Sequence, residues 1–163
     1  MKPLSLTLKN FGPYINETID FTKFEDSSLF LISGKTGSGK TTIFDGMSYA
    51  LFGESSGKLR LGKEMRSTFA DPSEATEVTL LFKHNEYLYE LNRLPEQELF
   101  KKRGTGARKQ SAKISLIVKD AQGKELRAYS KRREVDELIQ ELLHLNANQF
   151  AQIVLLPQGE FRT

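Results

Sequence analysis

The sequence predicts an α/β protein in which a helix follows a glycine-rich loop and most of the other elements form an antiparallel sheet. Two observations predict this class. A short apolar run at 29–32 leads directly into a glycine-rich segment at 34–41, and a helical pattern follows that segment. Elsewhere, apolar and polar residues alternate in several short segments separated by turn residues, which is typical of antiparallel strands with one solvated face.

The elements follow in order along the chain. Alternation begins at 4–9 and, after a turn at Gly12-Pro13, we expect a returning strand that reaches Phe21. After the glycine-rich loop, a helix is expected with one inward face, formed by Ile43, Met47, Ala50 and Leu51.

Three further alternating segments, at 78–82, 87–91 and 114–118, predict an antiparallel meander. Ser130 is expected to be the N-cap of a second helix, whose inward face is formed by Val135, Leu138, Ile139 and Leu142.

The glycine-rich segment reads GKTGSGKT and fits the pattern G-x-x-x-x-G-K-[ST], the P-loop that binds nucleotide phosphates. Glycines allow a tight turn and a close approach of the backbone to the phosphates. The amides that follow open a helix and form a site for anions. The sequence therefore predicts binding of ATP with Mg²⁺ through residues Gly34, Thr36, Gly37, Ser38, Gly39, Lys40, Thr41 and Thr42.

Individual roles within this motif follow from the chemistry of its side chains. Lys40 is expected to reach the β- and γ-phosphates as a point charge, and the Thr41 hydroxyl to ligate Mg²⁺. Thr42 is a candidate donor to the α-phosphate.

Length and composition set outer limits. The 163 residues suit a single domain over residues 1–163, and the absence of cysteine excludes disulfides and thiolate metal sites. No segment resembles a signal peptide and no apolar run is long enough to cross a bilayer, so we expect a cytoplasmic protein without a membrane partner.

Part of a hydrolytic site is missing. Hydrolysis at a P-loop needs a second carboxylate near the metal and a group that positions water. Asp20 ends a broken apolar pattern, Asp120 falls in an apparent hairpin turn, and no Leu-Ser-Gly-Gly signature occurs. We therefore expect this chain to bind ATP but not to hydrolyse it alone.

A P-loop beside a large antiparallel sheet suits ABC-type ATPases, whose nucleotide core carries an added antiparallel β-subdomain. The resemblance becomes specific in four tracts: 8–14 (LKNFGPY), the P-loop, 43–53 (IFDGMSYALFG) and 154–161 (VLLPQGEF). Together they resemble, in order and over essentially the whole chain, the N-terminal lobe of the SbcC family. These proteins are the ATPase subunits of a bacterial DNA double-strand-break nuclease and belong to the SMC-like ABC group.

The resemblance implies further roles and partners. Gln158 matches the family's Q-loop glutamine, which would contact Mg²⁺ and the γ-phosphate region, so Lys40 and Gln158 are the expected catalytic residues. From the residues alone, Gln158 could also lie in a surface turn. The family's Walker B aspartate, catalytic glutamate and signature lie in a C-terminal lobe beyond a coiled coil, so Glu160 is not assigned a role and this chain is expected to be a fragment.

The implied partners are that C-terminal lobe, a second ATPase head in a homodimer, an SbcD-type nuclease subunit and double-stranded DNA. The expected activity belongs to the whole ATPase and exonuclease complex, with the isolated chain inactive. A basic segment predicts the DNA contact, through Lys101, Lys102, Arg103, Arg108 and Lys109. The plainer interpretation of this segment is a solvated hairpin loop.

Other functions stay open at this point. An SMC-like chromosome-organising ATPase or a transporter domain is one alternative, although a transporter domain should carry its signature within this length. A nucleotide-switched DNA-binding module without hydrolysis is another. Lys131, Arg132 and Arg133 open the second helix, where the helix dipole disfavours cations, which hints at an anionic partner or marks a plain exposed face.

Overall fold

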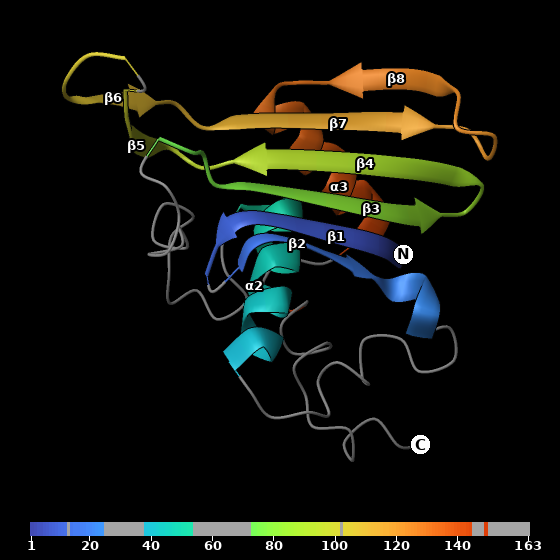
Figure 1. Ribbon diagram of the computed structural model, residues 1–163. Helices are drawn as coiled ribbons and strands as arrows, with labels where there is room; N and C mark the ends of the chain where they lie inside the picture. Colours follow the sequence, from blue (N-terminus) through green and yellow to red (C-terminus); the bar gives the residue numbers. More distant parts are fainter. Residues whose placement is uncertain (13, 25–37, 54–72, 102, 145–148, 150–163) are drawn as a thin grey trace.

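The fold is built on one six-stranded antiparallel sheet with helices on one of its faces (Figure 1). The computed structural model describes residues 1–12, 14–24, 38–53, 73–101, 103–144 and 149. The strand order is β2-β1-β3-β4-β7-β8, and every neighbouring pair is antiparallel. The strands span β1 Lys2–Phe11, β2 Tyr14–Asp20, β3 Glu77–His84, β4 Tyr87–Leu94, β7 Lys113–Lys119 and β8 Glu125–Tyr129.

Alternation of side chains explains why these segments form a sheet with two unlike faces. Leu6, Leu80, Leu91 and Leu116 are fully buried and stand opposite one another in register across β1, β3, β4 and β7. The other face is polar. There, Asn92 donates its amide to Glu77 Oε1 at 2.6 Å and to Thr79 Oγ1 at 2.9 Å.

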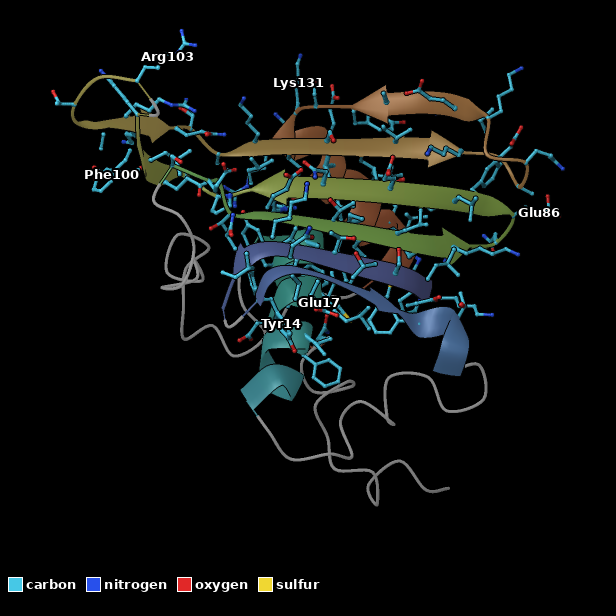
Figure 2. The ribbon with its side chains drawn as sticks, viewed as in Figure 1. Tyr14, Glu17, Glu86, Phe100, Arg103 and Lys131 are labelled. Atoms are coloured by element: carbon cyan, nitrogen blue, oxygen red, sulfur yellow. The ribbon has the colours of Figure 1, made fainter. Side chains whose placement is uncertain are left out.

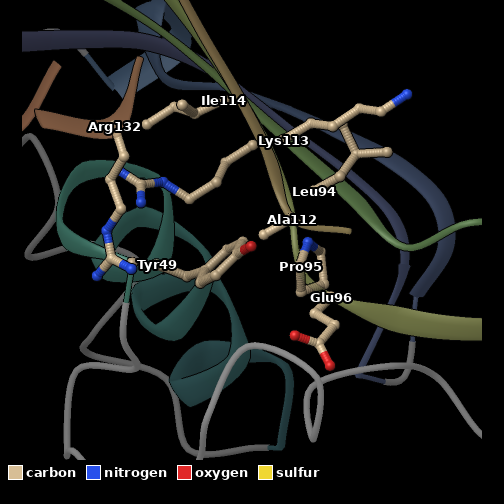
Figure 3. Close-up of a pocket in the computed structure, with 10 residues that line it drawn as sticks. Tyr49, Leu94, Pro95, Glu96, Ala112, Lys113, Ile114 and Arg132 are labelled. Carbon is tan, nitrogen blue, oxygen red and sulfur yellow. The ribbon is translucent and has the colours of Figure 1, made fainter. Parts of the chain in front are cut away.

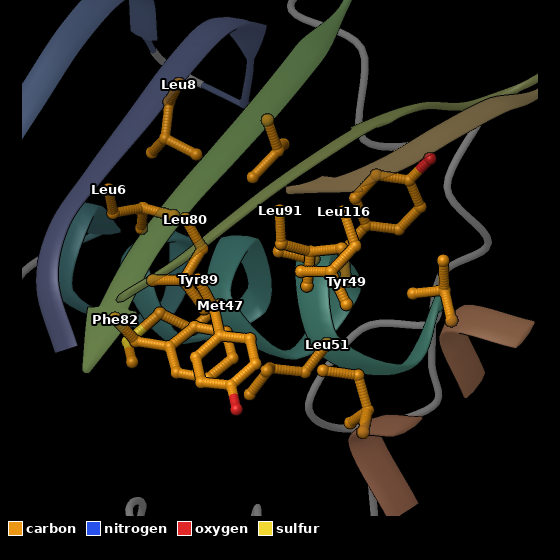
Figure 4. Packing of buried hydrophobic residues seen from close by; sticks show 14 of the residues in the cluster. Leu6, Leu8, Met47, Tyr49, Leu51, Leu80, Phe82, Tyr89, Leu91 and Leu116 are labelled. Carbon is orange, nitrogen blue, oxygen red and sulfur yellow. The ribbon is translucent and has the colours of Figure 1, made fainter. Parts of the chain in front are cut away.

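Two helices cover the apolar face. Helix α2 spans Ser38–Phe52 and α3 spans Arg132–Leu143, and both lie behind the sheet in Figure 1. Met47 and Leu51 of α2 belong to the same buried cluster as the sheet residues Phe82, Tyr89, Leu91 and Leu116, and Figure 4 shows Met47 close to Phe82 and Tyr89. A short 3-10 helix, η1, spans Phe21–Phe24 after β2.

A small hairpin, β5 Gln97–Phe100 and β6 Ala107–Gln110, is inserted between β4 and β7 and forms a separate two-stranded sheet. It projects beyond the end of the main sheet, and Phe100 and Arg103 lie at its outer part (Figure 2).

The predicted meander is confirmed in β3, β4 and β7, as is the hairpin of β1 and β2. The prediction that Ser130 caps the second helix is wrong. Because β8 runs through Tyr129, the N-cap position falls one residue later, on Lys131, whose side chain makes no capping hydrogen bond. The expected strand at 29–32 and the apolar run that ends at Leu156 lie outside the described residues.

Burial of the first helix extends beyond the single inward face that the sequence predicts. Every residue from Phe44 to Leu51 is buried, including Asp45 and Ser48. Within the described ranges, no helix is long and apolar enough to cross a membrane.

Candidate functional site

The P-loop motif meets the described structure at the first residues of α2. The helix begins at Ser38, so the backbone of residues 38–42 forms its first turn and a half. The first four amides of a helix have no partner within the helix, and the helix dipole places partial positive charge there. No acidic residue lies in this first turn. The N-terminal end of α2 therefore has the electrostatic character that a phosphate group needs.

The middle of α2 is fixed against β1 by a close approach at Gly46. A Cβ atom built on this glycine would lie 2.7 Å from Cδ2 of the fully buried Leu8. A larger residue would therefore force either the Leu8 side chain or the helix to move. The absence of a side chain at position 46 permits the close approach of the P-loop helix to β1.

The C-terminal end of α2 is held by Arg93, which comes from the end of β4. Its Nε donates a hydrogen bond to the carbonyl oxygen of Ala50 at 3.1 Å, and its Nη2 lies 3.6 Å from Oδ1 of Asp136 on α3. The last carbonyls of a helix have no intrahelical partner and carry partial negative charge, so a guanidinium is favourable there. One side chain thereby links the P-loop helix, the sheet and α3.

Two further contacts complete this cluster. The guanidinium carbon of Arg93 lies 5.9 Å from the centre of the Tyr49 ring, within the range of a cation–π contact. Gly53 has φ of +81°, and a Cβ there would lie 2.7 Å from Nη1 of Arg93. The glycine after α2 therefore both permits the left-handed turn and leaves room for the guanidinium.

Burial shifts the ionisation of both side chains. The pKa of Tyr49 is raised, chiefly by burial and against the smaller opposing effects of Arg93 and Arg132, so its hydroxyl keeps its proton at ordinary pH. The pKa of Arg93 is lowered, chiefly by burial and also by the neighbouring charge of Arg132, although Tyr49 and Asp136 act in the opposite sense. An arginine stays charged despite such a shift, so the cluster holds a buried positive charge.

A hydrogen-bonded group fixes the chain where it enters β3. Thr76 donates its backbone N–H to Oε1 of Gln97 at 2.8 Å and its hydroxyl to the carbonyl of Asn10 at 2.9 Å. Gln97 returns a bond to the Thr76 carbonyl at 3.2 Å, and Asn10 donates to the Ala75 carbonyl at 2.8 Å. These buried side chains tie the end of β1, the start of β3 and the start of β5 together.

The basic segment folds as the β5–β6 hairpin, and Lys101, Arg103, Arg108 and Lys109 are all exposed on it. Lys109 pairs with Glu96 at 3.0 Å. Both side chains of that pair are more than half exposed, so it adds little stability and leaves the hairpin free to meet an anionic surface. Lys102 lies outside the described residues.

Several expected site residues cannot be placed. Gly34, Thr36, Gly37 and Gln158 lie outside the described residues, and for residues 38–42 only the backbone is described. The sequence did not reveal the cluster around Arg93 that holds the C-terminal end of α2. Its only signal was a charged residue at an inward position of an alternating strand, as Leu91 and Arg93 are two residues apart on β4.

Comparison with known families defines the class of the chain. Residues 5–163 match the model of an AAA domain, and the chain belongs to this family. The match covers the P-loop motif, and membership of this family implies nucleotide binding.

Particular relatives agree with the resemblance drawn from the sequence. The chain is 48% identical over 165 residues to the SbcC subunit of the nuclease SbcCD from Lactococcus lactis, 45% identical over 163 residues to that of Vibrio cholerae and 46% identical over 162 residues to that of Staphylococcus aureus. Each alignment covers 99% of this chain and 16% of the relative. The expected resemblance to SbcC is confirmed over the N-terminal region, and the chain spans about a sixth of the length of these curated relatives.

Proposed function

We propose that this chain is the ATP-binding half of an ABC-type ATPase head of the SbcC kind. The observation that carries the proposal is that α2 begins within the P-loop motif, has no carboxylate in its first turn and is packed tightly on β1 at Gly46. A helix terminus held in this way presents its amides at a fixed place, which is what recognition of a phosphate requires.

The roles of individual residues follow from the motif. Gly34, Gly37 and Gly39 let the backbone approach the phosphates, Lys40 places its ammonium at the β- and γ-phosphates, and Thr41 ligates Mg²⁺. Gln158 completes the metal and γ-phosphate contacts, as in the family that the sequence resembles. Mg²⁺ supplies charge neutralisation on the phosphate oxygens when it is bound.

The rest of the catalytic site comes from outside this chain. A second lobe supplies the carboxylates and the signature loop, and two heads engage with ATP between them. Binding of ATP then favours the engaged form, and hydrolysis releases it, so that access of a nuclease partner to double-stranded DNA depends on the nucleotide state.

ATP turnover tests this composite site. We expect no turnover from this chain alone and turnover when it is mixed with a separately produced C-terminal lobe. In the same mixture, the Lys40→Ala chain should give no turnover. The Lys124→Ala chain, changed at an exposed lysine in the β7–β8 turn, should behave as the unchanged chain. Equal turnover by the isolated chain would mean that the composite site does not exist.

A second candidate function is a DNA-binding module, which the exposed cations of the β5–β6 hairpin favour. Phosphate contacts of this kind release counterions, so affinity for duplex DNA should fall steeply with salt. We expect combined neutralisation of Lys101, Lys102 and Arg103 to weaken binding and flatten the salt dependence. The matched control neutralises Lys83, Lys124 and Arg127, which are exposed elsewhere on the molecule. Equal binding by both triple variants would exclude the hairpin as the DNA site.

A further inference from the structure

A cavity of about 380 Å³ lies at the C-terminal end of α2, where four elements meet. Its walls come from the end of α2, the end of β4 and the residues after it, the start of β7, and the first residue of α3. Figure 3 shows Tyr49 in the middle of this space, with Arg132 on one side of it and Glu96 on the other. The P-loop lies at the opposite end of α2, about 22 Å away along a helix of 15 residues.

The charges around the cavity are unbalanced. Arg93, Lys113 and Arg132 line it, and Glu96 is the only carboxylate among the lining residues. Glu96 is already paired with Lys109 at 3.0 Å. Asp136 lies beside the cavity and is shared between Arg93 and Arg132, at 3.6 and 3.5 Å. The described residues therefore leave a net positive charge at this place.

Two features there favour a bound anion, and the first is a buried donor without a hydrogen-bond acceptor among the described residues. Arg93 is 5% exposed, and its Nη2 has no hydrogen-bond partner among the described residues; its contact with Asp136 is too long for one. A buried donor without a partner is rare and costly, particularly on a charged group.

The start of α3 is the second feature. Its N-cap, Lys131, makes no side-chain capping bond, and Lys131 and Arg132 place two cations near the positive end of the helix dipole. Glu134 is the acidic residue of this first turn, and Asp136 is already shared between Arg93 and Arg132. A bound anion beside Arg132 would offset the remaining positive charge.

We propose that this cavity is a second anion site, distinct from the P-loop, that takes a phosphate group. Arg132 and Lys113 contact the phosphate oxygens from the rim, and the first amides of α3 and the Tyr49 hydroxyl add neutral donors. Arg93 contributes its buried charge from below. A tetrahedral anion with several acceptor oxygens fits a donor set that arrives from several directions better than a planar carboxylate does.

The site has a direct connection to the proposed ATP site. Arg93 holds the Ala50 carbonyl at the end of α2, so an anion that draws the guanidinium toward itself acts on the same helix whose first turn faces the P-loop. Any such coupling is reciprocal, so ATP and the second phosphate should each alter the affinity for the other by the same factor.

The test follows backbone amide signals by NMR while inorganic phosphate or pyrophosphate is added at constant ionic strength. It uses the Lys40→Ala chain, in which the P-loop is weakened, and the unchanged chain in parallel. We expect saturable shifts of the signals of Gly53, Lys113 and Arg132. Arg132→Ala should weaken this binding about tenfold, since it removes a charge-assisted contact.

The matched control is Arg133→Ala, which removes a neighbouring cation of the same helix. Arg133 is 91% exposed, is paired with Glu137 and does not line the cavity. Its loss should change the affinity by no more than about twofold. An equal loss of phosphate affinity in both variants would mean that the positive charge of α3, and not the cavity, causes the binding. An absence of shifts up to about 10 mM phosphate would exclude the site.

A second arm identifies where the phosphate comes from. If duplex DNA moves the same three signals, with the same dependence on Arg132, the phosphate group in the cavity belongs to a nucleic-acid backbone. If phosphate still binds but DNA leaves these signals unmoved, the group belongs to a free phosphate or a nucleotide. The signals of residues 39–42 report the P-loop separately, so failure of the second site and failure of the ATP site are distinguishable.

Discussion

The two ends of α2 differ in what holds them and in how visible they are in the sequence. At the N-terminal end, a short motif of fixed residue types predicts a phosphate site. At the C-terminal end, Tyr49 and Gly53 of the helix end meet Arg93 from β4 and Asp136 from α3 only in the fold. Local chemistry is readable as a motif, whereas a cluster assembled by tertiary packing is not.

The two ends also separate function from stability. The N-terminal end offers amides that have no partner within the helix, and these can bind a ligand. Binding of such a ligand stabilises the folded state only when the ligand is present. The C-terminal end satisfies a helix carbonyl with a buried guanidinium and contributes to the folded state without any ligand. Substitutions at the N-terminal end should therefore lower the affinity for the ligand, and substitutions at the C-terminal end should lower the free energy of unfolding.

The largest expected effect on stability is at Arg93. Arg93→Ala removes the hydrogen bond to Ala50, the contact with Tyr49 and the packing of a buried side chain, so the free energy of unfolding should fall by about 2–3 kcal/mol. Urea unfolding followed by circular dichroism measures it. Arg127→Ala, at an exposed arginine of β8, is the control and should leave the midpoint unchanged. An equal midpoint for both variants would mean that Arg93 does not hold the helix end.

Gly53→Ala tests the space beside the guanidinium. The new Cβ would adopt an unfavourable positive φ and crowd Nη1 of Arg93, so we expect a loss of about 1–2 kcal/mol in the free energy of unfolding.

Gly123→Ala separates the two causes. Gly123 has φ of +89° in the β7–β8 turn, and a Cβ there would meet nothing within 4 Å. That variant should lose only the cost of the backbone conformation, about 1 kcal/mol. If the two alanine variants unfold at the same urea concentration, crowding by Arg93 is not significant.

The smallest effect is expected at the exposed pair of Arg133 and Glu137, 3.1 Å apart on successive turns of α3. Arg133→Ala should change the free energy of unfolding by less than about 0.5 kcal/mol, because exposed ion pairs are screened by water and salt. A loss comparable to that of Arg93→Ala would show that surface charge on α3, and not the buried contact, sets the stability of this region.

The sequence predicted the regular parts of the fold for a physical reason. Strict alternation in β1, β3, β4 and β7 reflects one apolar and one polar face, and a one-residue shift of register would invert them. A hairpin loop was one interpretation of the basic segment, but its strands and β8 were not predicted. The side chains of β6 and β8 are largely exposed, and β5 is only four residues long, so no apolar period marks them.

The burial of every residue from 44 to 51 of α2 was also hidden from the sequence. Asp45 and Ser48 interrupt the apolar pattern, yet both are buried. In the same way, Thr76 and Gln97 look like ordinary polar residues until their reciprocal hydrogen bonds are seen. Buried polar residues are defined by partners that lie far apart in the chain.

The measurement that tests the central claim most directly is a titration of this chain with ATP and Mg²⁺, followed by backbone amide NMR. We predict saturable shifts at residues 39–42, the first turn of α2, that are lost in Lys40→Ala and kept in Lys124→Ala. Shifts that are absent there, or that are equal in the two variants, would contradict ATP binding at the N-terminal end of α2.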